Sequence, residues 1–144
     1  MPLLRLLAPL FVSLALFGLA PTANTATDGA AVVAEISRRG DAAIRTYDPA
    51  NRLPTATEFS SLYFDVFEGA GMELDLGLKS PGLKSELEIL FGIVNGKAMR
   101  GVAADDLNTS WLELRGKLQE AGALYGKEDA SGFPTTSVAS ALPH

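Results

Sequence analysis

The spacing of apolar residues predicts amphipathic helices along most of the chain. In the first expected helix, apolar residues recur every three or four positions from Val33 to Tyr47, which is one face of a helix. The Asp48-Pro49 pair is expected to end it. Capping residues and later apolar stripes predict three more helices, at about 54–78, 80–98 and 105–125. With no competing strand pattern, we expect an all-α fold, an up-and-down four-helix bundle.

The second expected helix contains an unusual stretch from Leu62 to Gly77. It carries three glycines, each of which costs about 1 kcal/mol relative to alanine inside a helix. Two of them, Gly69 and Gly71, would let a ligand or a neighbouring helix approach the backbone closely. The simplest expectation is close packing against the first helix at its own glycine, Gly40.

The N-terminus has the layout of a secretory signal peptide. Arg5 precedes an apolar run from Leu6 to Leu19, and a stretch of small residues follows. The alternative, a retained membrane anchor, fits less well because a run of about 14 apolar residues is short of the roughly 20 that span a bilayer. We therefore expect a signal peptide at 1–26, a helical domain at 27–126, a disordered tail at 127–144, and a periplasmic protein.

Composition excludes several classes of function. Loss of Arg5 from the 12 basic residues leaves 11 against 17 acidic residues, a formal charge of −6, which disfavours nucleic acids and anionic membrane surfaces. Cysteine is absent and the single histidine is His144, the last residue. Thiolate metal sites, haem, cysteine catalysis and Ser-His-Asp triads are therefore not expected in the helical domain. We expect neither an enzyme nor a protein that inserts into the membrane after the signal is removed.

A helical wheel at about 100° per residue divides the carboxylates into two groups. In the second helix Glu73 and Leu74 fall within the apolar arc, whereas three other carboxylates lie on the opposite side: Asp65, Glu68 and Asp75. In the third helix the apolar arc includes Leu83, Leu90 and Ile93. Glu86 lies within this arc and is predicted to point inward, while Glu88 points outward.

Two inward carboxylates require compensation, because an unpaired carboxylate in an apolar interior costs several kcal/mol. A hard cation such as ferrous or ferric iron is one solution, and helix bundles hold such ions with glutamates. A second solution is a salt bridge with an arginine, for which the candidates are Arg45, Arg100 and Arg115. A third is that both carboxylates lie at the edge of the core and reach solvent. Asp65, Glu68 and Met72 also share a face with spacing adequate for an exposed cation site, although a solvated acidic face is the ordinary alternative.

The segment from Tyr63 to Gly101 resembles a known family. Its Tyr63-Phe64-Asp65, Phe67-Glu68-Gly69, Gly71-Met72-Glu73 and Ser85-Glu86-Leu87-Glu88 runs are similar to the exported helical domain that precedes the membrane part of bacterial high-affinity iron permeases, the iron/lead transporter family. The resemblance extends over about residues 30–125. It implies a periplasmic metal-handling or regulatory module, with Glu68, Glu73 and Glu86 as the functional positions.

The chain lacks the R-E-G-L-E type motif and the transmembrane helices of those permeases. We therefore expect a free-standing partner of a separately encoded permease, the alternative being a domain cut from its permease by gene fission or truncation. Our first hypothesis is a module that binds or senses iron through Glu73 and Glu86, helped by Glu68 and Asp65. The alternative is an interaction module that docks on a permease or another exported protein without metal.

Overall fold

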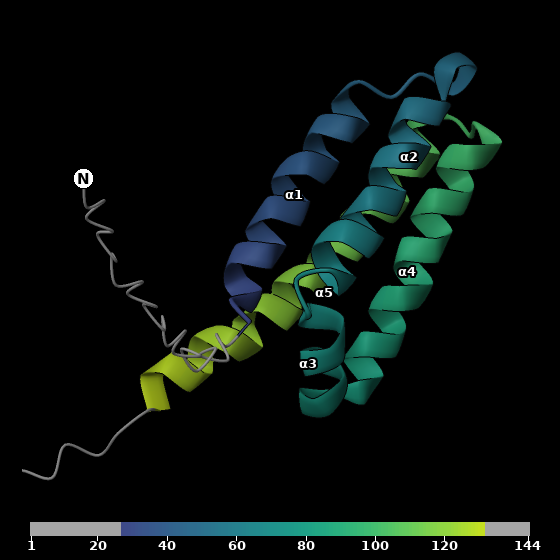
Figure 1. The fold of residues 1–144 in the computed structure, drawn as a ribbon. Helices are drawn as coiled ribbons and strands as arrows, with labels where there is room; N and C mark the ends of the chain where they lie inside the picture. The colour runs from purple at the N-terminus through teal and green to yellow at the C-terminus, as the bar shows by residue number, and fades with distance from the viewer. Residues whose placement is uncertain (1–26, 132–144) are drawn as a thin grey trace, which may run out of the picture.

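The computed structural model describes residues 27–131, and all regular elements in this range are helical (Figure 1). They are, in order, α1 (Gly29–Arg45), η1 (Pro49–Asn51), α2 (Leu53–Ser61), η2 (Leu62–Glu68), α3 (Met72–Lys79), α4 (Pro81–Arg100) and α5 (Ala104–Ser131). None of these helices is both long and apolar enough to cross a membrane. The expected signal peptide at 1–26 lies outside the described residues.

Local sequence accounts for the helix ends. Asp28 caps α1, where its Oδ1 accepts a hydrogen bond of 2.9 Å from the backbone N–H of Ala31. Pro81 occupies the first turn of α4, and Gly101 ends that helix with a φ of +67°. The fourth predicted helix ends later than expected: α5 continues past Gly126 to Ser131. The part of the expected tail beyond residue 131 is not among the described residues.

Helix α5 packs against both α1 and α4, and Figure 1 shows it behind the other long helices. The contact with α1 depends on glycine. A Cβ on Gly40 would lie 2.1 Å from the ring of Trp111, so only hydrogen lets the indole lie against α1. Trp111 is 1% exposed, and its Nε1 donates a hydrogen bond of 2.8 Å to Asp41. Gly40 therefore packs against Trp111, and the expected contact with Gly69 and Gly71 is wrong.

The second predicted helix is not continuous. After α2, seven residues form the π-helix η2, in which the N–H of Gly69 bonds the carbonyl of Phe64 at 3.0 Å, five residues back. Gly71 then adopts a φ of +79°, a left-handed conformation that side chains disfavour, and α3 begins at the next residue. The glycines thus mark a helix break, which resolves the apparent conflict with helix propensity.

The break also resets the helical phase. Beyond it Met72 and Leu76 are fully buried, whereas Leu74 and Leu78 are 71% and 80% exposed. A wheel continued from the first half of the segment placed Leu74 inward and Met72 outward. Both assignments are wrong because the π-helix and the turn rotate the following residues relative to a continuous α-helix.

Candidate functional site

Glu73 and Glu88 converge on one lysine. The Nζ of Lys84 lies 2.8 Å from Oε1 of Glu73 and 2.6 Å from Oε1 of Glu88. All three side chains are half-buried at the edge of the core, with Glu73 23% exposed. The compensation for Glu73 is therefore an ion pair, with a lysine in place of the expected arginine. Two carboxylates share one ammonium group, so this cluster carries one net negative charge.

The ion pairs of this cluster stabilise the charged forms of both Lys84 and Glu88. Hydrogen bonds with Glu73 and Glu88 raise the pKa of Lys84, and the hydrogen bond from Lys84 holds the pKa of Glu88 below its usual value. Burial raises the pKa of the Tyr63 hydroxyl, and the negative charges of Glu88, Glu73 and Glu68 raise it further. The positive charge of Lys84 lowers the pKa of Tyr63, but by less than the three glutamates raise it. The nearby charges therefore place Tyr63 in a negative field.

An aromatic pocket of about 280 Å³ adjoins Glu88, between α4 and the α2–η2 segment. Half of its lining residues are aromatic, and four carry polar side-chain atoms; the full lining is Phe59, Ser60, Tyr63, Phe64, Glu88, Phe91, Gly92 and Asn95. The ring of Tyr63 lies 4.9 Å from that of Phe64 and 5.3 Å from that of Phe91, both edge-on. Phe64 is 60% exposed, which is unusual for an aromatic side chain of this size.

The π-helix shapes this pocket. Its wider turn presents Tyr63 and Phe64 toward α4, while Phe67 is completely buried and packs its ring 5.5 Å from Phe91. Such π-helical insertions occur frequently at functional sites. On the opposite wall Asn95 donates from Nδ2 to Ser60 Oγ at 3.1 Å, which ties α4 to α2. The buried Oδ1 of Asn95 accepts no hydrogen bond from any described residue.

Glu86 does not point inward as predicted. Its side chain is 54% exposed and pairs with Lys117 of α5 at 2.8 Å. The error came from the placement of the apolar arc: Ile93, on the same side as Glu86, is 40% exposed, whereas Phe91 is 2% exposed and faces the core. The structure therefore joins Glu73 with Glu88, and Glu86 belongs to a separate ion pair.

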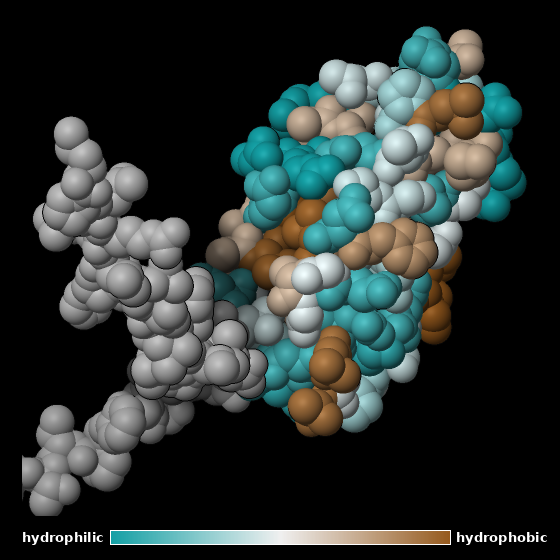
Figure 2. Space-filling model, in the orientation of Figure 1, coloured by the Kyte–Doolittle hydropathy of each residue, from teal (hydrophilic) through white to brown (hydrophobic). Residues whose placement is uncertain are grey.

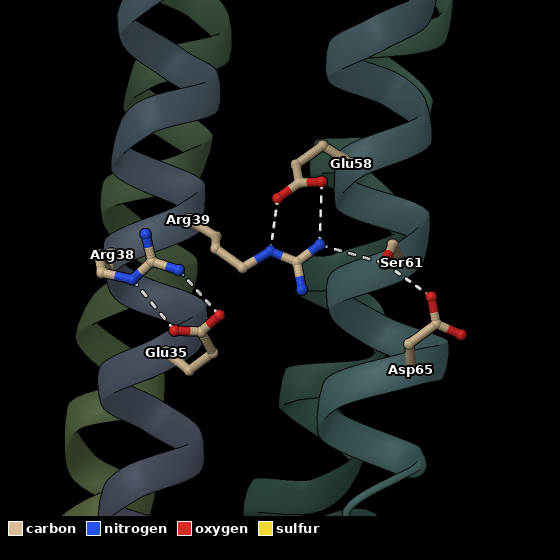
Figure 3. A network of polar contacts seen from close by, with 6 residues as sticks. All are labelled: Glu35, Arg38, Arg39, Glu58, Ser61 and Asp65. Atoms are coloured by element: carbon tan, nitrogen blue, oxygen red, sulfur yellow. Dashed lines mark hydrogen bonds and ion pairs between the residues drawn. The ribbon is translucent and has the colours of Figure 1, made fainter.

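Asp65 belongs to a network on the opposite side of α2 (Figure 3). Its Oδ2 accepts a hydrogen bond of 2.6 Å from Ser61 Oγ, which in turn accepts one of 3.2 Å from Arg39. Arg39 of α1 also donates two hydrogen bonds, of 2.6 Å and 2.9 Å, to the carboxylate of Glu58, which raises the pKa of its guanidinium. This bidentate pair joins α1 to α2, and the sequence pattern did not reveal it.

The four predicted metal ligands are distributed over different surroundings. Glu73 and Glu86 pair with different lysines, Asp65 contacts Ser61, and Glu68 is exposed. Met72 is fully buried, so the proposed exposed face with Asp65 and Glu68 is wrong. Among residues 27–131, no three Asp, Glu or His side chains are grouped so that they could hold a metal ion.

The sequence pattern did not reveal the pocket, because Glu88 was expected to point outward and the aromatic residues Phe59 and Tyr63 were expected to lie in the core. A useful signal was available in the positions of Tyr63, Phe64 and Phe67 just before the two closely spaced glycines. Comparison with known proteins adds nothing to this picture: the chain matches no protein-family model, no curated protein and no solved structure.

Proposed function

We propose that this protein is a non-enzymatic interaction module that docks on an exported or membrane partner without metal. Its surface for this role is the apolar face, which we define as Phe64 of η2, Leu74 and Leu78 of α3, and Ile89 and Ile93 of α4. The proposal includes export to the periplasm by a signal peptide at 1–26. We also propose that α2, η2 and α3 together form one of the four helices of an up-and-down bundle, with a break between η2 and α3.

The observation that carries this proposal is the concentration of exposed apolar side chains. Of the eight large apolar side chains exposed among the described residues, five belong to the apolar face. Figure 2 shows apolar surface at the lower end of the molecule, over α3, and along the edge formed by α4. These elements pack against one another, since α3 contacts both α4 and η2. Exposed apolar side chains gathered on neighbouring elements are typical of a protein interface.

The ion pairs of the carboxylates support a role independent of metal. The ammonium group of Lys84 compensates the charges of Glu73 and Glu88, and that of Lys117 compensates Glu86. None of these glutamates therefore needs a metal ion for stability. The resemblance of residues 30–125 to the exported domain of iron permeases suggests a separately encoded iron permease as the partner.

Co-purification with the iron permease of the same organism tests the proposal. The double variant Leu74→Ser/Leu78→Ser removes two highly exposed side chains, and Leu112→Ser on α5, where Leu112 is 52% exposed, is the matched control. We expect capture to fall about tenfold in the double variant, because two buried leucines contribute over 1 kcal/mol to an interface. Capture should persist in the control and in the presence of a chelator. Equal capture by both variants, or loss of capture with chelator alone, would refute the proposal.

A second candidate function is the binding of iron, in the ferrous or ferric state. It is favoured by the convergence of Glu73 and Glu88, because a cation could take the place that the Lys84 ammonium group occupies between them. Calorimetric titration of Lys84→Met tests it: removal of the competing ammonium should tighten iron binding about tenfold relative to the original protein. Unchanged or absent binding would exclude these carboxylates as a metal site.

A further inference from the structure

The aromatic pocket combines three features that together favour a ligand. It is open to solvent beside the exposed ring of Phe64, it has the rings of Tyr63 and Phe91 on its walls, and it has the carboxylate of Glu88 at its edge. Its volume of about 280 Å³ is at the small end of ligand pockets and suits a small organic group.

The charge of this site favours a cation. Glu73 and Glu88 share the single ammonium group of Lys84, which leaves one negative charge uncompensated at the pocket's edge. Aromatic faces also attract cations through their quadrupoles, and this attraction strengthens where water is partly excluded. Burial is the main cause of the raised pKa of the Tyr63 hydroxyl, and the charges of the nearby carboxylates raise this pKa further, as expected for a negative field.

We propose that this pocket binds an aliphatic ammonium group, with the carbon chain against Phe64 and Phe91 and the charged nitrogen beside Glu88. A hydrated metal ion would gain little from the rings, because its water shell holds it away from them. An anion would be repelled by Glu88. A neutral alcohol could still donate a hydrogen bond to the Glu88 carboxylate but would lose the attraction between opposite charges. The inference rests on the proposed function, because Phe64 belongs both to the pocket and to the apolar face, and a lysine of the docked partner carries the same chemical group.

Titration of the whole protein with n-butylammonium tests this proposal, with 1-butanol as the uncharged probe of similar shape. Two readouts follow binding: NMR shifts of Tyr63, Gly92 and Asn95, and the fluorescence of Trp111, the only tryptophan. Trp111 reports on the pocket through Phe59, whose ring centroid lies 5.6 Å from that of the indole. We expect saturable binding with a Kd of about 1 to 10 mM, and binding of the alcohol about tenfold weaker.

Three variants separate the charge from the rings. Glu88→Gln removes the negative charge and should weaken n-butylammonium binding about tenfold while weakening alcohol binding much less. Phe64→Leu keeps apolar volume but removes an exposed ring, and it should weaken the ammonium by about threefold. Glu113→Gln changes a carboxylate on the exposed side of α5 and should have no effect. Circular dichroism establishes that each variant is folded.

Equal binding of n-butylammonium and 1-butanol, or binding that Glu88→Gln leaves unchanged, would overturn the proposal. So would the absence of saturable shifts up to about 100 mM. These failures are distinct from failure of the proposed function, which is judged by the effect of Leu74→Ser/Leu78→Ser on permease capture. A further arm adds n-butylammonium to the capture assay: release of the permease identifies a partner lysine as the bound group, whereas ammonium binding without release identifies a free amine.

Discussion

Replacement of Gly40 by alanine tests the packing of α1 on α5. The added Cβ would lie 2.1, 2.4 and 2.6 Å from three carbon atoms of the Trp111 ring, whereas carbon atoms in contact are normally about 3.5 to 4.0 Å apart. The indole would have to retreat by more than 1 Å, roughly the difference between these distances. Such a movement would also break its hydrogen bond with Asp41.

The magnitude follows from three contributions. Overpacking of a core costs about 1 to 3 kcal/mol, and here the upper end applies because three ring atoms are involved. Loss of the hydrogen bond adds about 1 kcal/mol, and the better helix propensity of alanine recovers about 1 kcal/mol. We therefore expect Gly40→Ala to lower the free energy of unfolding by about 2 to 3 kcal/mol.

Urea unfolding followed by circular dichroism and by Trp111 fluorescence measures this change. The matched control is Gly116→Ala on α5, where an added Cβ meets no atom within 4 Å. It should raise the free energy of unfolding by up to about 1 kcal/mol through helix propensity alone. If Gly40→Ala is as stable as Gly116→Ala, the close contact between α1 and Trp111 described above does not exist.

Three further changes address the helix break and the carboxylate cluster. Gly71→Ala places a side chain at a φ of +79° and should destabilise the protein by about 1 to 2 kcal/mol, with Gly71→Asn intermediate; equal urea midpoints would contradict this. Lys84→Met should raise the pKa of Glu88, measured by carboxyl NMR. In the original protein the pKa of Glu88 is lower in the folded state than its usual value of 4.5. This difference stabilises the fold at a pH above 4.5, and the stabilisation is lost as the pH falls through the folded-state pKa. The free energy of unfolding of the variant should therefore depend less on pH in this acid range. Glu88→Gln should lower the pKa of Tyr63 toward 10, although burial, the larger cause, should keep it above that value, as ring-proton NMR can test.

Regular periodicity predicted most of the described fold. The first and third expected helices match α1 and α4 closely because their apolar stripes are continuous and their ends carry strong signals, such as Pro81 and Gly101. The second helix was predicted less well. Its glycines were recognised as costly, but the phase change that they introduce depends on hydrogen bonds between residues five apart, which no stripe of apolar residues reveals.

The candidate site was harder to predict than the fold. Glu73 was correctly expected to need a partner, but the partner depended on the rotation of α3, which brought it to Lys84 and Glu88. Glu86 was misplaced because one misassigned residue, Ile93, shifted the edge of the predicted arc. Side chains near the edge of an arc are sensitive to such shifts, whereas residues at its centre, such as Leu87, are not.

We propose that lysines, and not a metal ion, compensate the carboxylates of Glu73, Glu86 and Glu88. Calorimetric titration of the purified protein with ferrous and ferric ions tests it most directly, with Glu73→Gln as the companion variant. We expect no binding tighter than about millimolar for either ion. Binding in the micromolar range that Glu73→Gln abolishes would contradict it.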